Sequence, residues 1–346
     1  MSRDKNLSID ALIFDMDGVL IDVSRSYRQA IIQTVELFFT TGLGLPAEDT
    51  SLTLLDNDDI TALKMAGGFN NDWDITAAFI IYFLEMLPPF PMHTFPLKRH
   101  VPAILAYLQV AMGHRSDITI DMLRRDKNIE RLSEQVKKNG GGMGGLTQAL
   151  THRNRHLIST GKNLLKGNLI KRIFQELYLG QELFEEIYEE KPVVIQSDGL
   201  IKQESLFISP AILRELAEEL QLGIATGRPR AEAEYALRNL GISDYFHSLV
   251  TNDDVSAAEA KGKPNPWSLL EAARRLHPTP ARSAYIGDTP DDIRAAKAAN
   301  QVVPFLSIGC LAPAQDKEAL VQRFEELGAD IILSHPDRLP NIIFRS

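Results

Sequence analysis

The sequence contains a single cysteine, Cys310, among 346 residues. One cysteine excludes an internal disulfide and a thiolate metal site, and we expect a small, buried, apolar side chain. No apolar run approaches the ~20 residues that a bilayer-spanning helix requires. Residues 1–6 are polar and contain no apolar signal-peptide core. We therefore expect an intracellular, cytoplasmic protein without a membrane partner.

Positive charge is also scarce. The chain has 37 Lys and Arg against 46 Asp and Glu, which gives a net charge of −9. This balance argues against a broad basic surface and thus against nucleic acid as a partner. The eight histidines show no HxxxH spacing, so a zinc site is not expected. The hydrophobic content of 44% is enough for a globular core.

Two carboxylates follow the first apolar run of the chain. Residues 9–14 predict a short buried strand, and Asp15 and Asp17 come next, before Gly18. On an extended chain, positions i and i+2 point the same way. Two like charges held together are unfavourable unless a cation or a shared proton relieves them. The pair indicates a metal site or an acid–base pair, although Asp and Gly are also ordinary turn residues.

From about Ser209 onward, short apolar runs alternate with short helical patterns. This alternation is typical of an α/β fold, a Rossmann-like parallel sheet with helices on both faces. The expected strands are 222–226, 247–251, 283–287, 302–306 and 331–333, and the expected helices are 210–219, 230–240, 266–276, 291–299 and 317–327. The strand at 9–14 should join this sheet, because nothing near it in sequence could pair with it.

The middle of the chain has few β-branched runs and much helical periodicity, as at 118–138 and 164–189. We interpret residues 23–203 as an all-α domain inserted after the first strand, and residues 1–22 with 204–346 as the catalytic core.

A run of five glycines in six residues, 140–145, interrupts the helical patterns. We expect a flexible loop there, because glycine weakens regular structure. The run lacks the GK[ST] that a phosphate-binding P-loop needs. The basic cluster at 152–156 favours a solvated face, with contact to an anionic substrate tail as the alternative.

Open parallel sheets bind ligands at the carboxyl ends of their strands, and several such ends here carry polar residues. In chain order they are Thr226, Gly227, Arg228, Lys263, Asp288 and Asp292. The Thr226 hydroxyl and nearby amides could hold a phosphate oxygen at a helix start. Asp288 and Asp292 are four residues apart and can face one cation. Each motif alone is an ordinary turn or cap, but their order and shared position make the set specific.

With these motifs the chain resembles the haloacid dehalogenase superfamily, in its subfamily I phosphatase-like branch with an enlarged α-helical C1-type cap. The motifs lie within residues 8–22 and 204–335. The resemblance implies the catalytic residues Asp15, Asp17, Thr226 and Lys263, and the metal-binding residues Asp15, Asp17, Asp288 and Asp292. The implied substrate-binding residues are Gly18, Thr226, Gly227, Arg228 and Lys263.

The resemblance also implies a reaction, the Mg²⁺-dependent hydrolysis of a small phosphorylated metabolite of the sugar phosphate or phosphoglycolate type. Asp15 would attack phosphorus and form an aspartyl-phosphate, while Asp17 protonates the leaving alcohol and then deprotonates water. Mg²⁺ would be held by Asp15, the main-chain carbonyl of Asp17, and Asp288, with Asp292 orienting its waters. Lys263 would offset the clustered carboxylates.

The inserted domain is expected to act as a lid that closes over the phosphate. Its candidate specificity residues are Arg25, Asn70, Asn71, Asp72 and Trp73. The simpler interpretation of the same residues is a helix cap and turn at 70–72, a packing tryptophan and a solvated arginine.

Three other readings share the motifs or the fold. A phosphomutase of the β-phosphoglucomutase type would use the same Asp15 and return the phosphoryl group to its substrate. A carbon–halogen hydrolase needs the nucleophile but neither Asp17 nor the downstream metal acids. A catalytically silent binding or scaffold protein would use the enlarged insertion as a docking surface. The identity of the substrate and the oligomeric state are not encoded in these motifs.

Overall fold

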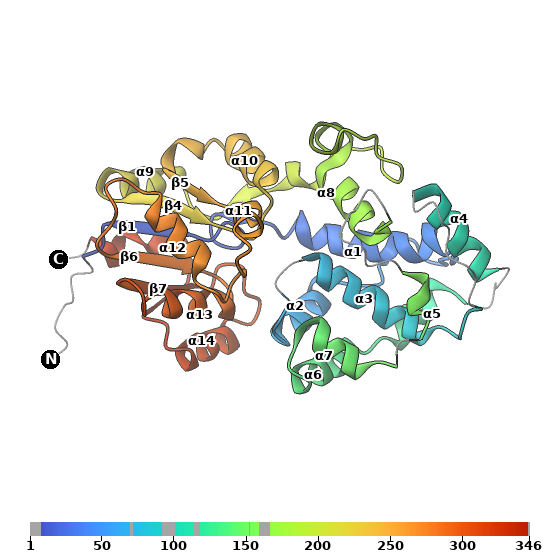
Figure 1. The fold of residues 1–346 in the computed structure, drawn as a ribbon. Helices are drawn as coiled ribbons and strands as arrows, with labels where there is room; N and C mark the ends of the chain where they lie inside the picture. Colours follow the sequence, from blue (N-terminus) through green and yellow to red (C-terminus); the bar gives the residue numbers. More distant parts are fainter. Residues whose placement is uncertain are drawn as a thin grey trace. The chain divides into compact units, whose positions relative to one another are not determined.

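The chain folds into two compact units, one containing residues 1–24 and 204–346 and the other residues 25–203. The computed structural model describes residues 8–69, 72–91, 101–113, 118–151, 153–158 and 167–344. We call residues 1–24 with 204–346 the sheet unit, and residues 25–203 the helical unit. Figure 1 shows the elements of each.

The sheet unit is built on six parallel strands in the order β5-β4-β1-β6-β7-β8. The strands are β1 (Ala11–Phe14), β4 (Gln221–Ala225), β5 (Ser248–Val250), β6 (Ser283–Gly287), β7 (Phe305–Cys310) and β8 (Ile331–Leu333). The first strand is central, since Ile13 pairs with Gly223 on one side and Tyr285 on the other. The predicted α/β class with a parallel sheet is confirmed.

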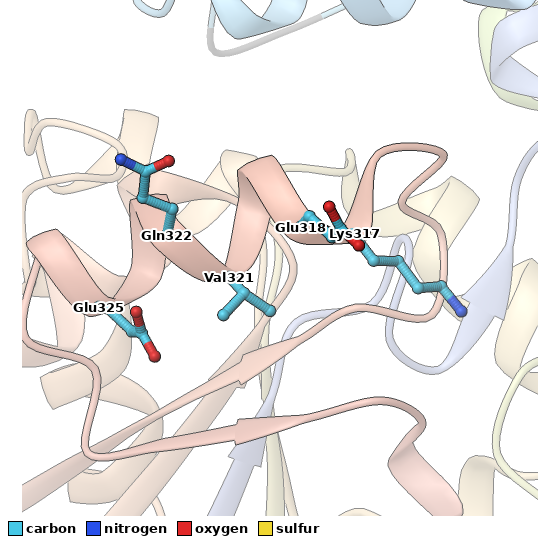
Figure 2. Close-up of a pocket in the computed structure, with 5 residues that line it drawn as sticks. All are labelled: Lys317, Glu318, Val321, Gln322 and Glu325. Carbon is cyan, nitrogen blue, oxygen red and sulfur yellow. The ribbon is translucent and has the colours of Figure 1, made fainter.

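Helices connect these strands and cover both faces of the sheet (Figure 1). They are α9 (Pro210–Glu219), α10 (Arg230–Asn239), α11 (Asn252–Ala257), α12 (Trp267–Arg274), α13 (Pro290–Ala299), α14 (Lys317–Glu326) and α15 (Pro340–Ile343). Ser209 caps α9 by accepting a hydrogen bond from the Ile212 amide, and Pro210 occupies its first turn. A hollow of about 330 Å³ lies along α14 (Figure 2). Its lining contains none of the residues that the sequence singles out.

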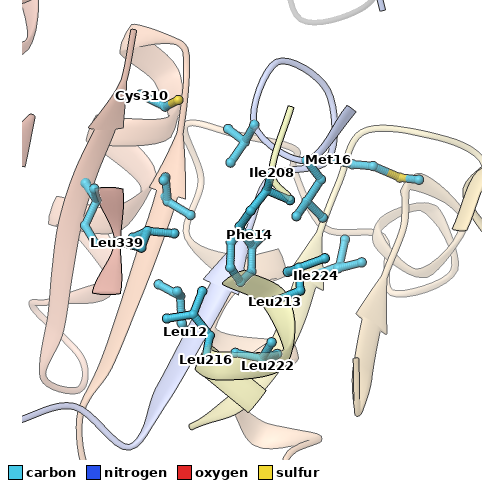
Figure 3. Packing of buried hydrophobic residues seen from close by; sticks show 14 of the residues in the cluster. Leu12, Phe14, Met16, Ile208, Leu213, Leu216, Leu222, Ile224, Cys310 and Leu339 are labelled. Carbon is cyan, nitrogen blue, oxygen red and sulfur yellow. The ribbon is translucent and has the colours of Figure 1, made fainter. Parts of the chain in front are cut away.

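The core alternates between the two faces of the sheet, because successive strand residues point to opposite sides. Leu12 and Phe14 belong to one buried cluster, which also contains Leu213 and Leu216 of α9 (Figure 3). Ile13 belongs to a second cluster, with residues of α12 and α13. Cys310 is buried, as predicted, and burial raises the pKa of its thiol to about 12.

The strand predicted at 302–306 and the helix predicted at 118–138 differ from the structure. The strand expected at 302–306 begins only at Phe305, because Val302 and Val303 form the turn that ends α13 and are exposed. Their apolar side chains led to the prediction of a strand, but their amides donate hydrogen bonds to the Ala299 carbonyl at the end of α13. The helix expected at 118–138 is two helices, α5 (Ile120–Asp126) and α6 (Ile129–Lys138). Asn128 starts the second one by accepting a hydrogen bond from the Arg131 amide.

The helical unit also contains α1 (Tyr27–Leu37), α2 (Asn57–Met65), α3 (Asp72–Met86), α4 (Val101–Met112), α7 (Gly142–Ala149) and α8 (Leu169–Tyr188). Helix α1 packs against α3 and α8, and the Tyr27 ring stacks on Tyr178 with centroids 4.2 Å apart. Among the described residues, no helix combines the length and apolar character needed to cross a membrane.

The glycine run at 140–145 is not a flexible loop, so that prediction is wrong. Helix α7 begins at Gly142, whose amide donates a hydrogen bond to the Gly67 carbonyl at 2.8 Å. A Cβ atom on Gly141 would lie 2.6 Å from that same carbonyl oxygen. The absence of side chains therefore allows the backbone at Gly141 and Gly142 to contact the backbone at Gly67. The glycine run serves close packing of these two segments.

The two chain segments that link the units pair with each other. Strand β2 (Ile21–Asp22) runs antiparallel to β3 (Ser205–Leu206), with Ile21 opposite Leu206. Both strands belong to the sheet unit. The chain therefore leaves the sheet unit and returns to it at one place.

Candidate active site

The carboxyl ends of β1, β4 and β6 bring several predicted residues to one edge of the sheet. Asp15 follows β1 and its amide donates to the Ile286 carbonyl at 2.8 Å, which continues the pairing with β6. Thr226 follows β4 and is buried. Asp288 follows β6 directly. Because β1 lies between the other two strands, residues that follow all three strands meet at this edge.

Three carboxylates converge at this edge. Asp15, Asp288 and Asp292 each offer one oxygen atom, and these atoms lie within 4.8 Å of one another. Oxygen ligands of Mg²⁺ stand 2.0–2.1 Å from the ion, so opposite ligands are about 4.2 Å apart. A small closure would place the oxygens of Asp15 and Asp288 on one such cation, with the Asp292 carboxylate beside them. The cluster therefore fits a divalent metal.

Lys263 supplies the positive charge next to this cluster. Its Nζ atom lies 2.9 Å from Asp15 Oδ2 and 2.7 Å from Asp292 Oδ1. It also donates to the hydroxyl oxygen of Tyr285 at 2.8 Å. Burial opposes the charge on Lys263, but the two carboxylates outweigh burial and raise the pKa of the ammonium group above its ordinary value.

The pKa values of the two carboxylates beside Lys263 shift in opposite directions. Burial is the main reason that the pKa of Asp15 rises to about 7, and the negative charges of Asp292 and Asp17 add to the rise. Burial acts on Asp292 too, but there the charge and hydrogen bond of Lys263 outweigh it and hold the pKa below its ordinary value. A cation at the cluster would favour the ionised form of Asp15.

Asp292 is fixed by four hydrogen bonds. Its Oδ1 atom accepts from Lys263 and from the Tyr285 hydroxyl, the latter at 3.0 Å. Its Oδ2 atom accepts from the Thr289 amide at 2.9 Å and from the Thr289 hydroxyl at 2.6 Å. The contact from the Thr289 amide and the return bond from the Asp292 amide to the Thr289 hydroxyl oxygen, at 3.3 Å, form the capping box that starts α13. One carboxylate thus both caps the helix and anchors Lys263.

Asp17 makes a different set of contacts. Its Oδ1 atom accepts from Arg228 Nε at 2.7 Å. Arg228 also donates to both carboxylate oxygens of Glu204, each at 3.0 Å. Sequence reasoning missed Glu204, because it lies outside every motif and only the fold brings it to this loop.

Tight turns hold the loops at this edge. Gly18 has a φ of +78°, and a Cβ atom there would lie 2.4 Å from Asp288 Oδ2. Only glycine satisfies both conditions at this position. The Thr226 hydroxyl accepts from the Arg228 amide at 3.2 Å, and nothing lies within 4 Å of a Cβ atom built on Gly227. The loop after β4 is therefore open beside Gly227.

Two of the specificity residues predicted in the helical unit, Asp72 and Trp73, have local partners within that unit. Asp72 pairs with Lys64 at 2.9 Å. The Nζ atom of Lys171 stands 4.4 Å from the centroid of the Trp73 ring. Arg25 is exposed. The predictions for Asn70 and Asn71, and part of the basic cluster at 152–156, fall outside the described residues.

The structure is thus an α/β fold with three converging carboxylates and a lysine at the carboxyl edge of its parallel sheet. The profile of the haloacid dehalogenase-like hydrolase family matches residues 9–300. The chain belongs to this family, as the resemblance predicted.

Two curated relatives illustrate the similarity. The chain is 26% identical over 336 residues to an imidazoleglycerol-phosphate dehydratase of Phytophthora nicotianae, covering 94% of this chain and 50% of that protein. It is 36% identical over 105 residues to a phosphoglycolate phosphatase of Salmonella paratyphi A, covering 29% of this chain and 40% of that protein. The chain thus spans half or less of the length of these relatives.

A crystal structure from the Northeast Structural Genomics Consortium has a similar fold. It superposes with a TM-score of 0.64 at 22% identity, covering 97% of this chain and 98% of the other. At this identity the likeness concerns the fold alone.

Proposed function

We propose that the chain is a Mg²⁺-dependent phosphatase that hydrolyses a small phosphorylated metabolite through an aspartyl-phosphate on Asp15. One observation carries the proposal. The Lys263 ammonium lies between Asp15 and Asp292, while Asp288 brings a third carboxylate oxygen to the same place. Such a pairing of an anionic nucleophile with positive charge suits an attack on a phosphate, which is itself anionic.

Asp15 is the nucleophile of the proposed reaction. A carboxylate oxygen of Asp15 forms a bond to phosphorus as the bond from phosphorus to the ester oxygen breaks. Lys263 keeps positive charge beside Asp15 and so favours its ionised form. The Thr226 hydroxyl and the open turn at Gly227 orient the phosphate oxygens.

Asp17 moves the protons. It gives a proton to the leaving alcohol in the first step and takes one from the water that attacks the aspartyl-phosphate in the second. The Asp17 side chain is 32% exposed, so it can meet a substrate while Arg228 holds one of its oxygens.

A bound Mg²⁺ would neutralise charge on the phosphate oxygens. Asp15, the main-chain carbonyl of Asp17, and Asp288 would hold it. Asp292 would orient the metal ligands without being one of them. Its side chain is already engaged, because all four of its hydrogen bonds go to Lys263, Tyr285 and Thr289.

The relatives suggest two substrates to test first. Phosphoglycolate is the substrate in the name of the Salmonella relative. The Phytophthora relative is named after a different phosphate ester, imidazoleglycerol phosphate, and it matches nearly the whole of this chain. Both compounds are small alkyl phosphates, which is the class that we propose.

The test is a screen of small phosphate esters with and without Mg²⁺, in which released phosphate is measured. We expect Mg²⁺-dependent release from at least one alkyl phosphate. Asp15→Asn should abolish turnover while circular dichroism shows the wild-type fold. Asp291→Asn is the matched control, because Asp291 lies on α13 and pairs with Arg294. Near-normal turnover by folded Asp15→Asn would reject the nucleophile.

The same screen separates the alternatives. A phosphomutase would convert a sugar phosphate to its isomer without releasing phosphate. A silent scaffold would show no reaction at any Mg²⁺ concentration. The lid function expected of the helical unit stays a prediction.

A further inference from the structure

A buried arginine joins Asp17 to a carboxylate outside all of the motifs. Arg228 Nε lies 2.7 Å from Asp17 Oδ1, and Nη2 contacts the same oxygen. The other side of the guanidinium faces Glu204, with Nη1 and Nη2 each 3.0 Å from a carboxylate oxygen. The Arg228 and Glu204 side chains are both only 1% exposed.

The guanidinium of Arg228 is held between two carboxylates. The contact with Glu204 is a fork of two parallel hydrogen bonds, which fixes the plane of the guanidinium. With that plane fixed, the remaining Nε–Nη2 edge points at Asp17. Every nitrogen of the guanidinium thereby contacts a carboxylate of the chain itself.

The backbone ties the same segments together. Glu204 immediately precedes β3, and β3 pairs with β2. The Gly18 amide donates to the Ile21 carbonyl at 2.9 Å, so the turn that carries Asp17 is closed onto β2. The segment with Asp17 and the segment with Glu204 are therefore joined once through backbone and once through Arg228.

We infer that Arg228 is a positioning residue that orients the Asp17 carboxylate for proton transfer, and that Glu204 holds Arg228 in place. The inference rests on the proposed function, in which Asp17 protonates the leaving alcohol. It differs from the prediction that Arg228 binds the phosphate itself.

Leaving-group dependence distinguishes these roles. An alkyl phosphate releases a strongly basic alkoxide unless an acid protonates it, whereas p-nitrophenolate leaves readily without a proton. A misplaced Asp17 should therefore impair phosphoglycolate much more than p-nitrophenyl phosphate. The quantity to compare is kcat/KM, because it covers every step up to formation of the aspartyl-phosphate.

The experiment measures both kcat/KM values with Mg²⁺ for wild type and for Arg228→Met. We expect a loss of about 100-fold for phosphoglycolate and of less than about fivefold for p-nitrophenyl phosphate. Arg228→Lys should recover part of the lost activity. Arg230→Met is the control, because Arg230 pairs instead with Glu234 and Asp254. It should leave the ratio of the two values unchanged.

Glu204→Gln provides a second, isosteric test, and it carries the inference if Arg228→Met does not fold. It removes the charge that fixes Arg228 and should show the same selective loss, smaller in size. In the double variant Asp17→Asn/Arg228→Met, loss of the arginine should add little to the loss from Asp17→Asn.

Other outcomes overturn the inference. An equal loss with both substrates, or a raised KM with kcat unchanged, would mean that Arg228 binds phosphate or only supports the fold. A further large loss in the double variant would mean that Arg228 acts independently of Asp17. If Asp17→Asn is selective and Arg228→Met is not, only the inference fails. If Asp17→Asn itself lowers both values equally, the acid role in the proposed function fails, and the inference with it.

Discussion

The Tyr285 hydroxyl lies 2.8 Å from Nζ of Lys263, and this contact links a buried strand residue to the ammonium group beside Asp15. The same hydroxyl donates to Asp292 Oδ1 at 3.0 Å. The Tyr285 hydroxyl thus contacts both the lysine and its carboxylate partner. Neither its position in β6 nor its residue type marked it as a site residue in the sequence.

We predict that Tyr285→Phe loosens Lys263 without removing it. Loss of the hydroxyl should reduce the free energy of unfolding by about 1 kcal/mol and kcat by roughly tenfold or less. Thermal melts and steady-state phosphate release with saturating Mg²⁺ measure the two effects. Tyr235→Phe on α10 is the control and should change neither. A wild-type kcat in Tyr285→Phe would show that the hydroxyl does not position Lys263.

Gly18→Ala should disturb the metal site in particular. Its φ of +78° disfavours alanine, and the new Cβ atom would lie 2.4 Å from Asp288 Oδ2. We expect the Mg²⁺ concentration for half-maximal activity to rise by at least about tenfold, because Asp288 must move. Gly241 has a φ of +68° with no atom within 4 Å of a Cβ position. Gly241→Ala therefore carries only the backbone cost and should keep the wild-type Mg²⁺ requirement; an equal rise in both variants would contradict the argument.

The glycine run of the helical unit makes a prediction about stability. Gly140→Ala and Gly141→Ala both place alanine at positive φ, which costs about 1 kcal/mol or slightly more. Only at Gly141 does the new Cβ atom meet a backbone oxygen, that of Gly67, at 2.6 Å. Its variant should lose roughly 1–3 kcal/mol beyond the loss in Gly140→Ala. Urea unfolding followed by circular dichroism compares them, and equal midpoints would refute the packing role.

Asp254 should contribute to stability against acid. Burial disfavours its ionised form, but hydrogen bonds from Thr251 and Arg275 and the charge of Arg230 outweigh burial and lower its pKa to about 2. Because the folded pKa lies below the ordinary value of 3.8, the contribution is present above that pH and is lost as the pH falls toward 2. Asp254→Asn should cost about 1 kcal/mol at pH 7, after allowance for solvent screening.

The pH dependence provides the check on Asp254. The urea midpoint of Asp254→Asn should lie below that of wild type at pH 7, and the two should converge near pH 2. The exposed Asp244 is the control, since Asp244→Asn should leave the midpoint unchanged at both values. A constant difference at all pH values would attribute the effect to packing and not to charge.

Mg²⁺ itself should stabilise the sheet unit. A ligand at 100 times its dissociation constant adds about 2.7 kcal/mol to the free energy of unfolding. We expect Mg²⁺ to raise the melting temperature of the wild-type chain and of Asp291→Asn, and to have little effect on Asp288→Asn. Differential scanning fluorimetry with and without EDTA measures this, and an equal rise in Asp288→Asn would exclude Asp288 as a ligand.

Local patterns in the sequence were sufficient for much of the sheet unit. Ser283–Gly287 and Ile331–Leu333 are strands with the predicted bounds, because each is a short apolar run flanked by turn residues. The predicted start of the strand at 302 was wrong for a physical reason. Val302 and Val303 are apolar, but they form the turn that ends a helix at the surface.

The contacts that complete the site could not be derived in this way. Glu204 reaches Arg228 only because β3 folds back onto β2, and these strands are too short to leave a pattern in the sequence. The glycine run was misinterpreted because its partner is a second glycine pair, Gly67 and Gly68, far away in the chain. Both are consequences of tertiary contact, which composition and periodicity do not encode.

The central position of β1 in the sheet affects how the chain folds while it is being synthesised. Its partners β4 and β6 are translated only after the whole of residues 25–203. A nascent chain that stops near residue 210 would thus carry an apolar N-terminal segment with no strand beside it. The helical unit is continuous in sequence and can fold during this interval. Strand β1 can therefore find its first partner in the sheet only when β4 has emerged from the exit tunnel.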